Sequence, residues 1–211
     1  MVKVKICGIR SLVDALEAVA AGADALGFVF YRASRRYVAP EMAGWIIRQL
    51  PERVKKVGVF VNARAATIKR YARQCSLDMV QLHGNESART CSQCAPVPVI
   101  KAFCVGKKFD AGVIEGYNTF GFLFDAHVPG KAGGSGKTFD WSLIKTIPSF
   151  RMPSEIFLSG GLNARNVSKA IRMVRPQWVD ASSSLELFPG KKDRRKMVAF
   201  VKAVKHTAIV P

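Results

Sequence analysis

The chain has 211 residues, 49% of them hydrophobic, and a formal net charge of +18. This length suits one globular domain over residues 1–211, and no apolar run approaches the ~20 residues that a membrane span needs, so we expect no association with a membrane. The high positive charge leaves two classes open, a nucleic-acid-binding protein and an enzyme that acts on anionic substrates.

Short β-rich segments alternate with amphipathic segments along the chain. In chain order, the predicted elements are strand Lys3–Cys7, helix Ser11–Ala21, strand Ala25–Phe30, helix Ala39–Gln49, strand Lys56–Val61, helix Ala65–Gln74, strand Met79–Leu82, helix Ser87–Cys94, strand Pro98–Phe103, helix Phe109–Tyr117, strand Gly121–Asp125, helix Trp141–Ile147, strand Ile156–Ser159, helix Asn166–Val174, strand Trp178–Ala181 and helix Arg194–Val204. Ser11 is a typical N-cap, and Pro40 suits the first turn of its helix. The helical pattern is weakest in Phe109–Tyr117.

Eight strands that alternate with eight helices indicate parallel strands joined by helical crossovers. The continuous apolar runs Leu26–Phe30 and Val57–Val61 are typical of strands buried on both faces. We therefore predict a single (β/α)8 TIM barrel over the whole chain. Periodicity alone leaves a doubly wound open sheet as the alternative. The Gly-rich run Pro129–Gly136 follows a strand, so we interpret it as a functional loop and not as a domain boundary.

The five cysteines are odd in number and irregularly spaced, which favours reduced thiols over a disulfide framework. Cys91 and Cys94 form a CxxC pair, but no second pair of cysteines or histidines follows to complete a tetrahedral zinc site. The first residues alternate charged and apolar side chains, unlike a secretory signal. We therefore expect a cytoplasmic, unprocessed protein without a bound metal.

In such barrels the active site is built at the C-terminal ends of the strands. Cys7 ends the first predicted strand, His83 follows the fourth, and Asp125 ends the sixth. Each also has a purely structural interpretation. Cys7 could be a small buried thiol, His83 could fix a loop by a hydrogen bond, and Asp125 could be a carboxylate paired with another group. Gly160 and Gly161 follow the seventh strand, where they suit either a tight turn or the close approach of backbone N–H groups to a phosphate.

Seven segments together resemble the successive signatures of the phosphoribosylanthranilate isomerases, in the order of that family and nearly from end to end. They are Lys5–Ile9 (KICGI), Ser34–Tyr37 (SRRY), Val57–Asn62 (VGVFVN), Gln81–Gly84 (QLHG), Gly133–Trp141 (GGSGKTFDW), Leu158–Leu162 (LSGGL) and Pro189–Asp193 (PGKKD). The resemblance implies a (β/α)8 barrel and an Amadori rearrangement in tryptophan biosynthesis. N-(5-phosphoribosyl)anthranilate becomes 1-(2-carboxyphenylamino)-1-deoxyribulose 5-phosphate, without any cofactor.

By resemblance, Cys7 is the general base, Asp125 is the general acid, and Arg36 binds the anthranilate carboxylate, with Arg35 as the lesser candidate. His83 lines the site without a proton-transfer role. The predicted backbone contacts to the phosphate come from Gly134, Gly160, Gly161 and Ser183. On chemical grounds we expect a raised pKa for the Asp125 carboxyl at the end of an apolar strand. We expect a lowered pKa for the Cys7 thiol near Lys5, the arginine pair and the N–H dipoles.

One position departs from the family pattern after the last strand. The family usually reads Ser-Ser-Gly-Val-Glu, whereas this chain has Ser182-Ser183-Ser184-Leu185-Glu186. Ser184 either restores a contact to the phosphate through its hydroxyl or crowds the phosphate.

Three alternative functions are weighed against the isomerase. A sugar isomerase of histidine synthesis is disfavoured, because those barrels usually have aspartate in place of Cys7. A nucleic-acid-binding barrel is suggested only by the charge, and a barrel that has lost its activity only by Ser184. The expected partner is a small phosphorylated substrate, with no nucleic acid, and the protein is a monomer or a homodimer.

Overall fold

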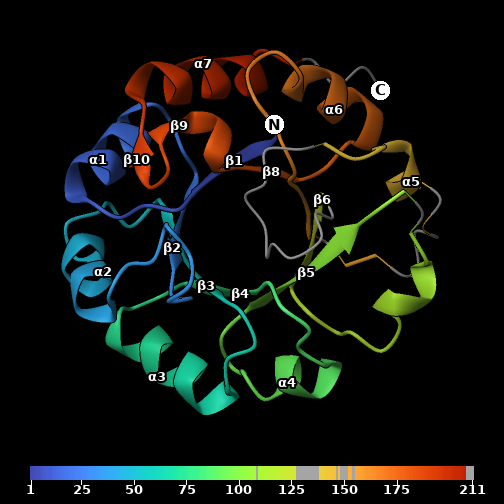
Figure 1. Ribbon diagram of the computed structural model, residues 1–211, viewed down its shortest axis with the longest axis horizontal. Helices are drawn as coiled ribbons and strands as arrows, with labels where there is room; N and C mark the ends of the chain where they lie inside the picture. Colours follow the sequence, from blue (N-terminus) through green and yellow to red (C-terminus); the bar gives the residue numbers. More distant parts are fainter. Residues whose placement is uncertain (108, 127–137, 146, 148–151, 154, 208–211) are drawn as a thin grey trace.

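The computed structural model describes residues 1–107, 109–126, 138–145, 147, 152–153 and 155–207. Eight parallel strands form a closed barrel, in which each strand pairs with the next along the chain and β8 pairs with β1 (Figure 1). The strands are β1 (Lys3–Cys7), β2 (Ala25–Val29), β3 (Lys55–Phe60), β4 (Met79–Leu82), β5 (Val99–Val105), β6 (Gly121–Ala126), β7 (Glu155–Leu158) and β8 (Trp178–Ala181). The predicted barrel is confirmed, and all eight strands lie where the sequence predicts them to within two residues.

The α-helices surround the barrel as an outer ring (Figure 1). They are α1 (Leu12–Ala20), α2 (Pro40–Ile47), α3 (Ala65–Gln74), α4 (Ala88–Ser92), α5 (Ser142–Lys145), α6 (Val167–Val174) and α7 (Arg194–Lys205). Ser11 caps α1 by accepting a hydrogen bond from the backbone N–H of Asp14, as predicted, and Pro40 begins α2.

The predicted helix Phe109–Tyr117 is wrong. This stretch contains only a single 3-10 turn, η1 (Ala111–Ile114). Asp110 Oδ1 accepts a hydrogen bond from Gly112 N at 2.8 Å and so begins the turn. The chain is already extended at Glu115, whose ψ is 140°, and Gly116 follows with a φ of +78°, so the turn does not continue as a helix.

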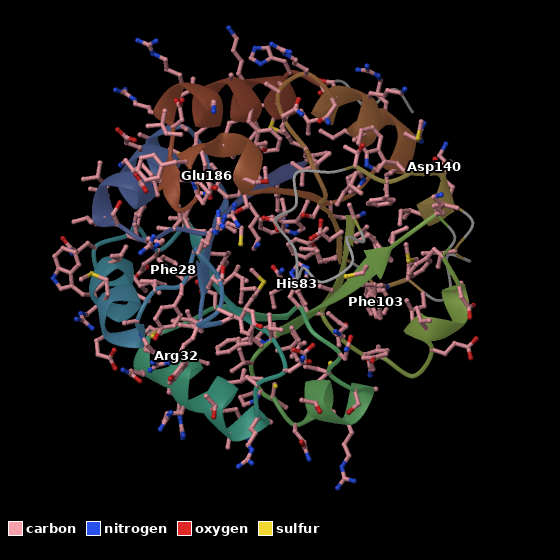
Figure 2. The ribbon with its side chains drawn as sticks, in the orientation of Figure 1. Phe28, Arg32, His83, Phe103, Asp140 and Glu186 are labelled. Atoms are coloured by element: carbon pink, nitrogen blue, oxygen red, sulfur yellow. The ribbon has the colours of Figure 1, made fainter. Side chains whose placement is uncertain are left out.

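The barrel interior is filled in layers. A cluster of apolar side chains from seven of the strands fills the half of the barrel nearer the N-terminal ends of the strands. The cluster comprises Ala25, Val57, Met79, Ile100, Ala102, Leu123, Phe157 and Trp178. Because residues two apart on a strand share one face, the next interior positions toward the C-terminal ends are Lys5, Gln81 and Asp180. Cys7, His83 and Asp125 follow at the mouth. Figure 2 shows His83 near the middle of the ring and Asp140 at its rim.

A small hairpin follows β8 that the sequence analysis did not predict. After the 3-10 turn η3 (Ser183–Leu185), strands β9 (Glu186–Phe188) and β10 (Lys191–Lys192) pair antiparallel through a turn that contains Gly190 at a φ of +90°. Lys191 donates a hydrogen bond to Asp14 Oδ1 of α1 at 2.5 Å. The hairpin therefore docks against α1 and brings Glu186 and Lys192 to the barrel mouth. Within the described part of the chain, no helix has the length and apolar character to cross a membrane.

Candidate active site

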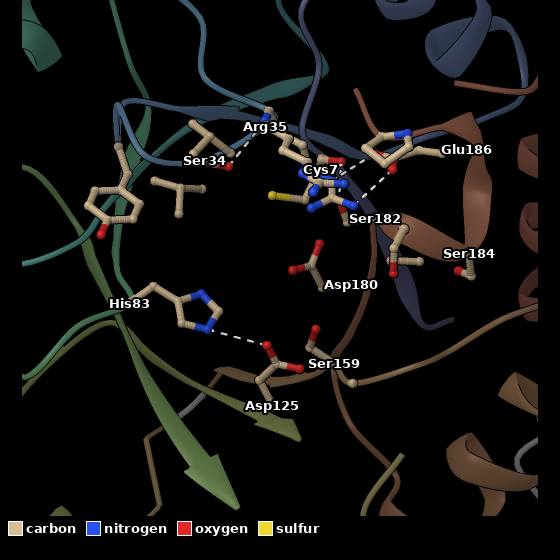
Figure 3. Close-up of a pocket in the computed structure, with 18 of the residues that line it drawn as sticks. Cys7, Ser34, Arg35, His83, Asp125, Ser159, Asp180, Ser182, Ser184 and Glu186 are labelled. Carbon is tan, nitrogen blue, oxygen red and sulfur yellow. Dashed lines mark hydrogen bonds and ion pairs between the residues drawn. The ribbon is translucent and has the colours of Figure 1, made fainter. Parts of the chain in front are cut away.

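A cavity of about 650 Å³ opens at the C-terminal ends of the strands (Figure 3). All but one of the predicted site residues line it: Cys7, Arg36, His83, Asp125, Gly160, Gly161 and Ser183. The other predicted residue, Gly134, lies outside the described residues. Residues from seven of the strand ends and from the hairpin after β8 thus meet in one place, as the barrel fold requires.

Cys7 lies at the end of β1 with only 7% of its surface exposed. Its neighbour on β2 is Gly27, and a Cβ at position 27 would lie 2.7 Å from Cys7 Sγ. The absence of a side chain at Gly27 therefore makes room for the thiol. Ser182 Oγ donates a hydrogen bond to the carbonyl oxygen of Cys7 at 2.9 Å, which fixes the end of β1 against the loop after β8.

Beneath Cys7 the barrel contains a buried ion pair that the sequence analysis did not assign. Lys5 Nζ lies 3.0 Å from Asp180 Oδ1, and the Lys5 side chain is completely buried. Burial is the largest single effect and lowers the pKa of Lys5, but the charge and hydrogen bond of Asp180 together with those of Cys7 raise it by more, so Lys5 keeps its proton. A cation therefore lies close to the predicted base.

The expectation of a lowered pKa for Cys7 is wrong for the free protein. Burial raises the pKa of the thiol; the Lys5 ammonium acts in the opposite direction, the Asp180 carboxylate raises it again, and the net shift is upward. The sequence analysis took account of the nearby cations but not of the paired anion or of complete burial. The thiolate is thus a minor species of the free protein at neutral pH.

Asp125 ends β6 with its carboxyl facing the same cavity. Its Oδ1 accepts a hydrogen bond from Ala126 N at 2.8 Å, and its Oδ2 lies 3.3 Å from His83 Nε2 (Figure 3). Gly160 passes directly over this group: it has a φ of +86°, and a Cβ there would lie 2.8 Å from Ala126 N and 3.2 Å from Asp125 Oδ1. Only glycine allows the loop after β7 to approach the carboxyl this closely.

Arg36 reaches the cavity across Gly8, whose φ is +85°. A Cβ at Gly8 would lie 2.6 Å from Arg36 Cδ. The guanidinium donates two hydrogen bonds to Glu186, from Nε to Oε1 at 2.7 Å and from Nη2 to Oε2 at 2.8 Å. Lys192 Nζ lies 3.0 Å from the same Oε1 and also donates to Ser182 O.

The cluster of Arg36, Glu186 and Lys192 holds two basic groups around one acid. Burial raises the pKa of Glu186, but its bonds to Arg36 and Lys192 lower it below the usual value, so Glu186 is a carboxylate. Burial lowers the pKa of Lys192 despite the charge of Glu186, whereas in Arg36 the same effect of burial is outweighed by the bonds to Glu186, which raise the pKa. The guanidinium of Arg36 is therefore the group of this cluster that presents a positive charge to an incoming anion.

The loops after β7 and β8 are tied together at the other side of the mouth. Gly160 and Gly161 both have positive φ, and Asn163 and Asn166 donate side-chain hydrogen bonds to Gly161 O at 3.3 and 3.0 Å. Ser184 Oγ donates a hydrogen bond to Leu162 O. The hydroxyl of Ser184 thus joins the two loops, and the choice between a contact to the phosphate and crowding of the phosphate stays a prediction.

The sequence analysis gave no role to the polar residues Gln81, Asp180, Glu186 and Lys192, and it named Lys5 only as a cation near Cys7. A signal existed for Lys5 and Gln81, because each lies two residues before a predicted site residue on the same strand and hence on the same face. Asp180 interrupts the apolar strand β8, which is a sign of a paired or functional carboxylate. Glu186 and Lys192 lack a local signal, because only the hairpin brings them to Arg36.

Comparison with known proteins decides the family. A sequence model described as N-(5'-phosphoribosyl)anthranilate isomerase matches residues 4–203. The chain belongs to the phosphoribosylanthranilate isomerase family. The isomerase of Pelobacter propionicus is 47% identical over 207 residues, which cover 98% of this chain and 97% of that protein.

Solved structures of the same family superimpose closely on the barrel. The phosphoribosylanthranilate isomerase of Thermotoga maritima has a TM-score of 0.90 and 47% identity, with 97% of this chain and 99% of that chain covered. A second solved isomerase, in complex with reduced 1-(o-carboxyphenylamino)-1-deoxyribulose 5-phosphate, has a TM-score of 0.87 and 45% identity, with the same coverage. The site described above thus lies in the fold of a known isomerase family.

The contact of Ser184 predicts the effect of its removal. Ser184→Ala deletes the hydrogen bond to Leu162 O but keeps the backbone, so the loops after β7 and β8 lose a tie worth about 0.5–1.5 kcal/mol. We expect weaker binding of the phosphorylated substrate and of inorganic phosphate by about 2- to 12-fold, with kcat nearly unchanged. Ser92→Ala is the matched control, since Ser92 Oγ also donates to a carbonyl oxygen but on the exposed helix α4. Tighter binding by Ser184→Ala would show that Ser184 crowds the phosphate.

Proposed function

We propose that this chain catalyses the reaction for which its family is named, the conversion of N-(5-phosphoribosyl)anthranilate into 1-(2-carboxyphenylamino)-1-deoxyribulose 5-phosphate in tryptophan biosynthesis. The observation that supports this most directly is the pairing of a buried thiol and a carboxyl at one cavity. Cys7 comes from β1 and Asp125 from β6, and both line the same mouth. The reaction needs one group to remove a proton from carbon and one to deliver a proton to oxygen.

The proposed reaction begins with Asp125 as the general acid. Its carboxyl donates a proton to the furanose oxygen while the bond between C1 and that oxygen breaks, which leaves a protonated Schiff base between C1 and the anthranilate nitrogen. Cys7, as the thiolate, then removes the proton from C2 to give an enolamine, which tautomerises to the ketone. C1 is reduced and C2 is oxidised within the same molecule, so the overall change requires no external oxidant or reductant.

The buried Lys5 supports Cys7 in this role. A thiolate inside the barrel is costly, because burial disfavours its charge, and Lys5 is the nearby cation that opposes this cost. Asp180 keeps Lys5 charged at the same time. Cys7 can therefore act as the base, although only a small fraction of it is a thiolate in the free protein.

The carboxylate of the substrate is proposed to bind at Arg36. Glu186 already occupies Nε and Nη2 of Arg36, so the incoming carboxylate either uses the remaining side of the guanidinium or displaces Glu186. If Glu186 is displaced from Arg36, Lys192 remains its ion-pair partner. The charge of the Arg36 guanidinium supports the binding of an anion in both cases.

The phosphate is proposed to bind at the opposite side of the mouth, to backbone N–H groups of Gly160, Gly161 and Ser183, together with Gly134 as the sequence predicts. The positive φ of both glycines and the ties of their loop support this site. His83 is proposed to line the cavity near Asp125. The high positive charge of the chain would speed the capture of a substrate with two anionic groups, and we expect no nucleic-acid partner.

The expected compartment is the cytoplasm, and the expected assembly is a monomer or a homodimer. All five cysteines are free thiols, which supports a reducing compartment.

Arg36→Ala is expected to weaken substrate binding more than it slows turnover. A charge-assisted pair of hydrogen bonds contributes about 1.5–3 kcal/mol, so KM should rise by about 10- to 100-fold while kcat falls much less. Arg36→Lys should recover only part of the loss, because an ammonium cannot form the two-pronged contact. Arg32→Ala serves as the control, since Arg32 is exposed and contacts the ring of Tyr37 outside the cavity. An unchanged KM with a collapsed kcat would assign Arg36 to the chemistry instead.

Cys7→Ala and Asp125→Asn should each lower kcat by about 10²-fold or more, with smaller changes in KM. The double variant should be no worse than the poorer single variant, because the loss of either role already blocks the reaction. Cys7→Ser should be inactive as well, since a serine hydroxyl does not ionise in this pH range. Steady-state kinetics with freshly prepared substrate measures all four variants. Near-normal kcat in Cys7→Ser would exclude Cys7 as the base.

The raised pKa of Cys7 predicts a pH dependence that is clearest in Asp125→Asn, where the acid no longer titrates. A raised pKa keeps the thiol protonated at pH values at which a free thiol, with a pKa of about 8.5, already ionises. The residual kcat/KM of Asp125→Asn should therefore rise with pH and continue to rise beyond pH ~8.5. A plateau near neutral pH would show that the thiol has a lowered pKa when it reacts, contrary to this expectation.

A further inference from the structure

A buried amide inside the barrel has no role in the reaction as described so far. Gln81 lies on β4 two residues before His83, so both side chains face the interior, and only 1% of Gln81 is exposed. Burial of an amide is costly unless the amide forms hydrogen bonds. Gln81 Nε2 lies 2.7 Å from Nδ1 of His83, which makes His83 the partner of this amide.

The contact between Gln81 and His83 determines which nitrogen of the imidazole carries the proton. The amide nitrogen can only donate, so Nδ1 of His83 must accept, and the proton of the neutral ring is then on Nε2. Nε2 faces Asp125, with Oδ2 at 3.3 Å (Figure 3). The three side chains therefore form a line from the barrel interior to the proposed acid.

The distance of 3.3 Å is long for a hydrogen bond, and His83 Nε2 has no other hydrogen-bond partner within the described residues. Its N–H is thus available to a carboxylate at Asp125. Hydrogen bonds of catalytic groups are often long in the free enzyme and shorten as the reaction proceeds. Oδ1 of Asp125 already accepts a hydrogen bond from Ala126 N, so His83 would give the second carboxylate oxygen its donor.

We propose that Gln81 and His83 are positioning residues for Asp125: Gln81 fixes His83 with its proton on Nε2, and this N–H stabilises the carboxylate that Asp125 becomes when it has given its proton to the furanose oxygen. The proton that moves goes from Asp125 to the substrate, and the imidazole stays neutral throughout. This inference rests on the proposed role of Asp125 as the acid and adds to it the two residues through which the barrel interior supports that role.

The direct test is the tautomer of His83 in the unmodified protein. The ¹⁵N chemical shifts of the ring nitrogens distinguish a proton on Nε2 from one on Nδ1, and the signal is assigned with His83→Asn. We expect the Nε2–H form at neutral pH. A proton on Nδ1 would overturn the proposal, because the amide of Gln81 would then present its oxygen to the ring and Nε2 would have no hydrogen for Asp125.

Kinetics test the function of the pair. Gln81→Met removes the donor at similar size, and Gln81→Glu replaces the donor with an acceptor. Each should lower kcat by about tenfold or more with KM changed less than about threefold, because the acid as a whole contributes about 10²–10⁴-fold and part of this depends on its surroundings. Gln93→Glu, which makes the same chemical change on the exposed end of α4, should leave both constants unchanged. A rise in KM alone would make Gln81 and His83 substrate contacts and overturn the proposal.

A double-mutant comparison separates this inference from the assignment of the acid. In an Asp125→Asn background, Gln81→Met should cause no further loss of kcat, since the carboxylate on which the pair acts is gone. An equal loss in both backgrounds would refute the positioning role. If Asp125→Asn alone leaves kcat unchanged, the proposed acid is wrong; if it lowers kcat while the Gln81 variants do not, only the present inference fails.

Discussion

A single buried ion pair sets the conditions for the active site. Lys5 lies wholly inside the barrel, and its charge is tolerable there only because Asp180 lies 3.0 Å away. The Lys5–Asp180 pair lies between the apolar cluster at the N-terminal ends of the strands and the polar mouth at their C-terminal ends. Cys7 lies directly above it on β1, so the proposed base experiences a fixed cation and a fixed anion at once. The upward shift of the thiol pKa is the result of this balance together with burial.

The charged groups around Arg36 are also held in contact with opposite partners. Arg36 is bound by Glu186, and Glu186 is bound in turn by Lys192. Groups held in this way lose little orientational freedom when a substrate enters, which is the condition for electrostatic preorganisation. The guanidinium of Arg36 and the backbone amides at Gly160 and Gly161 lie on different loops. A ligand with two separated anionic groups can therefore contact both.

The sequence was sufficient for most of the fold, because the buried parallel strands have continuous apolar runs and the segments between them are amphipathic. It was also sufficient to bring Cys7, Asp125 and the glycines after β7 to one mouth, since these lie at strand ends. The helix predicted at Phe109–Tyr117 failed because the chain is extended at Glu115 and Gly116 has a positive φ. The pairing of Arg36 with Glu186, 150 residues apart in the chain, depends on a hairpin with no local signal. The prediction of a lowered pKa for Cys7 failed for a similar reason, because Asp180, the anion that pairs with Lys5, comes from β8.

The seam between β1 and β8 joins the beginning and the end of the chain. Ser182 bonds the carbonyl of Cys7 across 175 residues, and Lys5 finds its anion on the same late strand. While the ribosome is still making the chain, β1 exists long before β8, and Lys5 has no partner that would allow it to be buried. Closure of the barrel must therefore follow synthesis of the last strand. A nascent chain that lacks β8 has neither the closed core nor the charge environment of Cys7, so catalytic competence and completion of the fold arrive together.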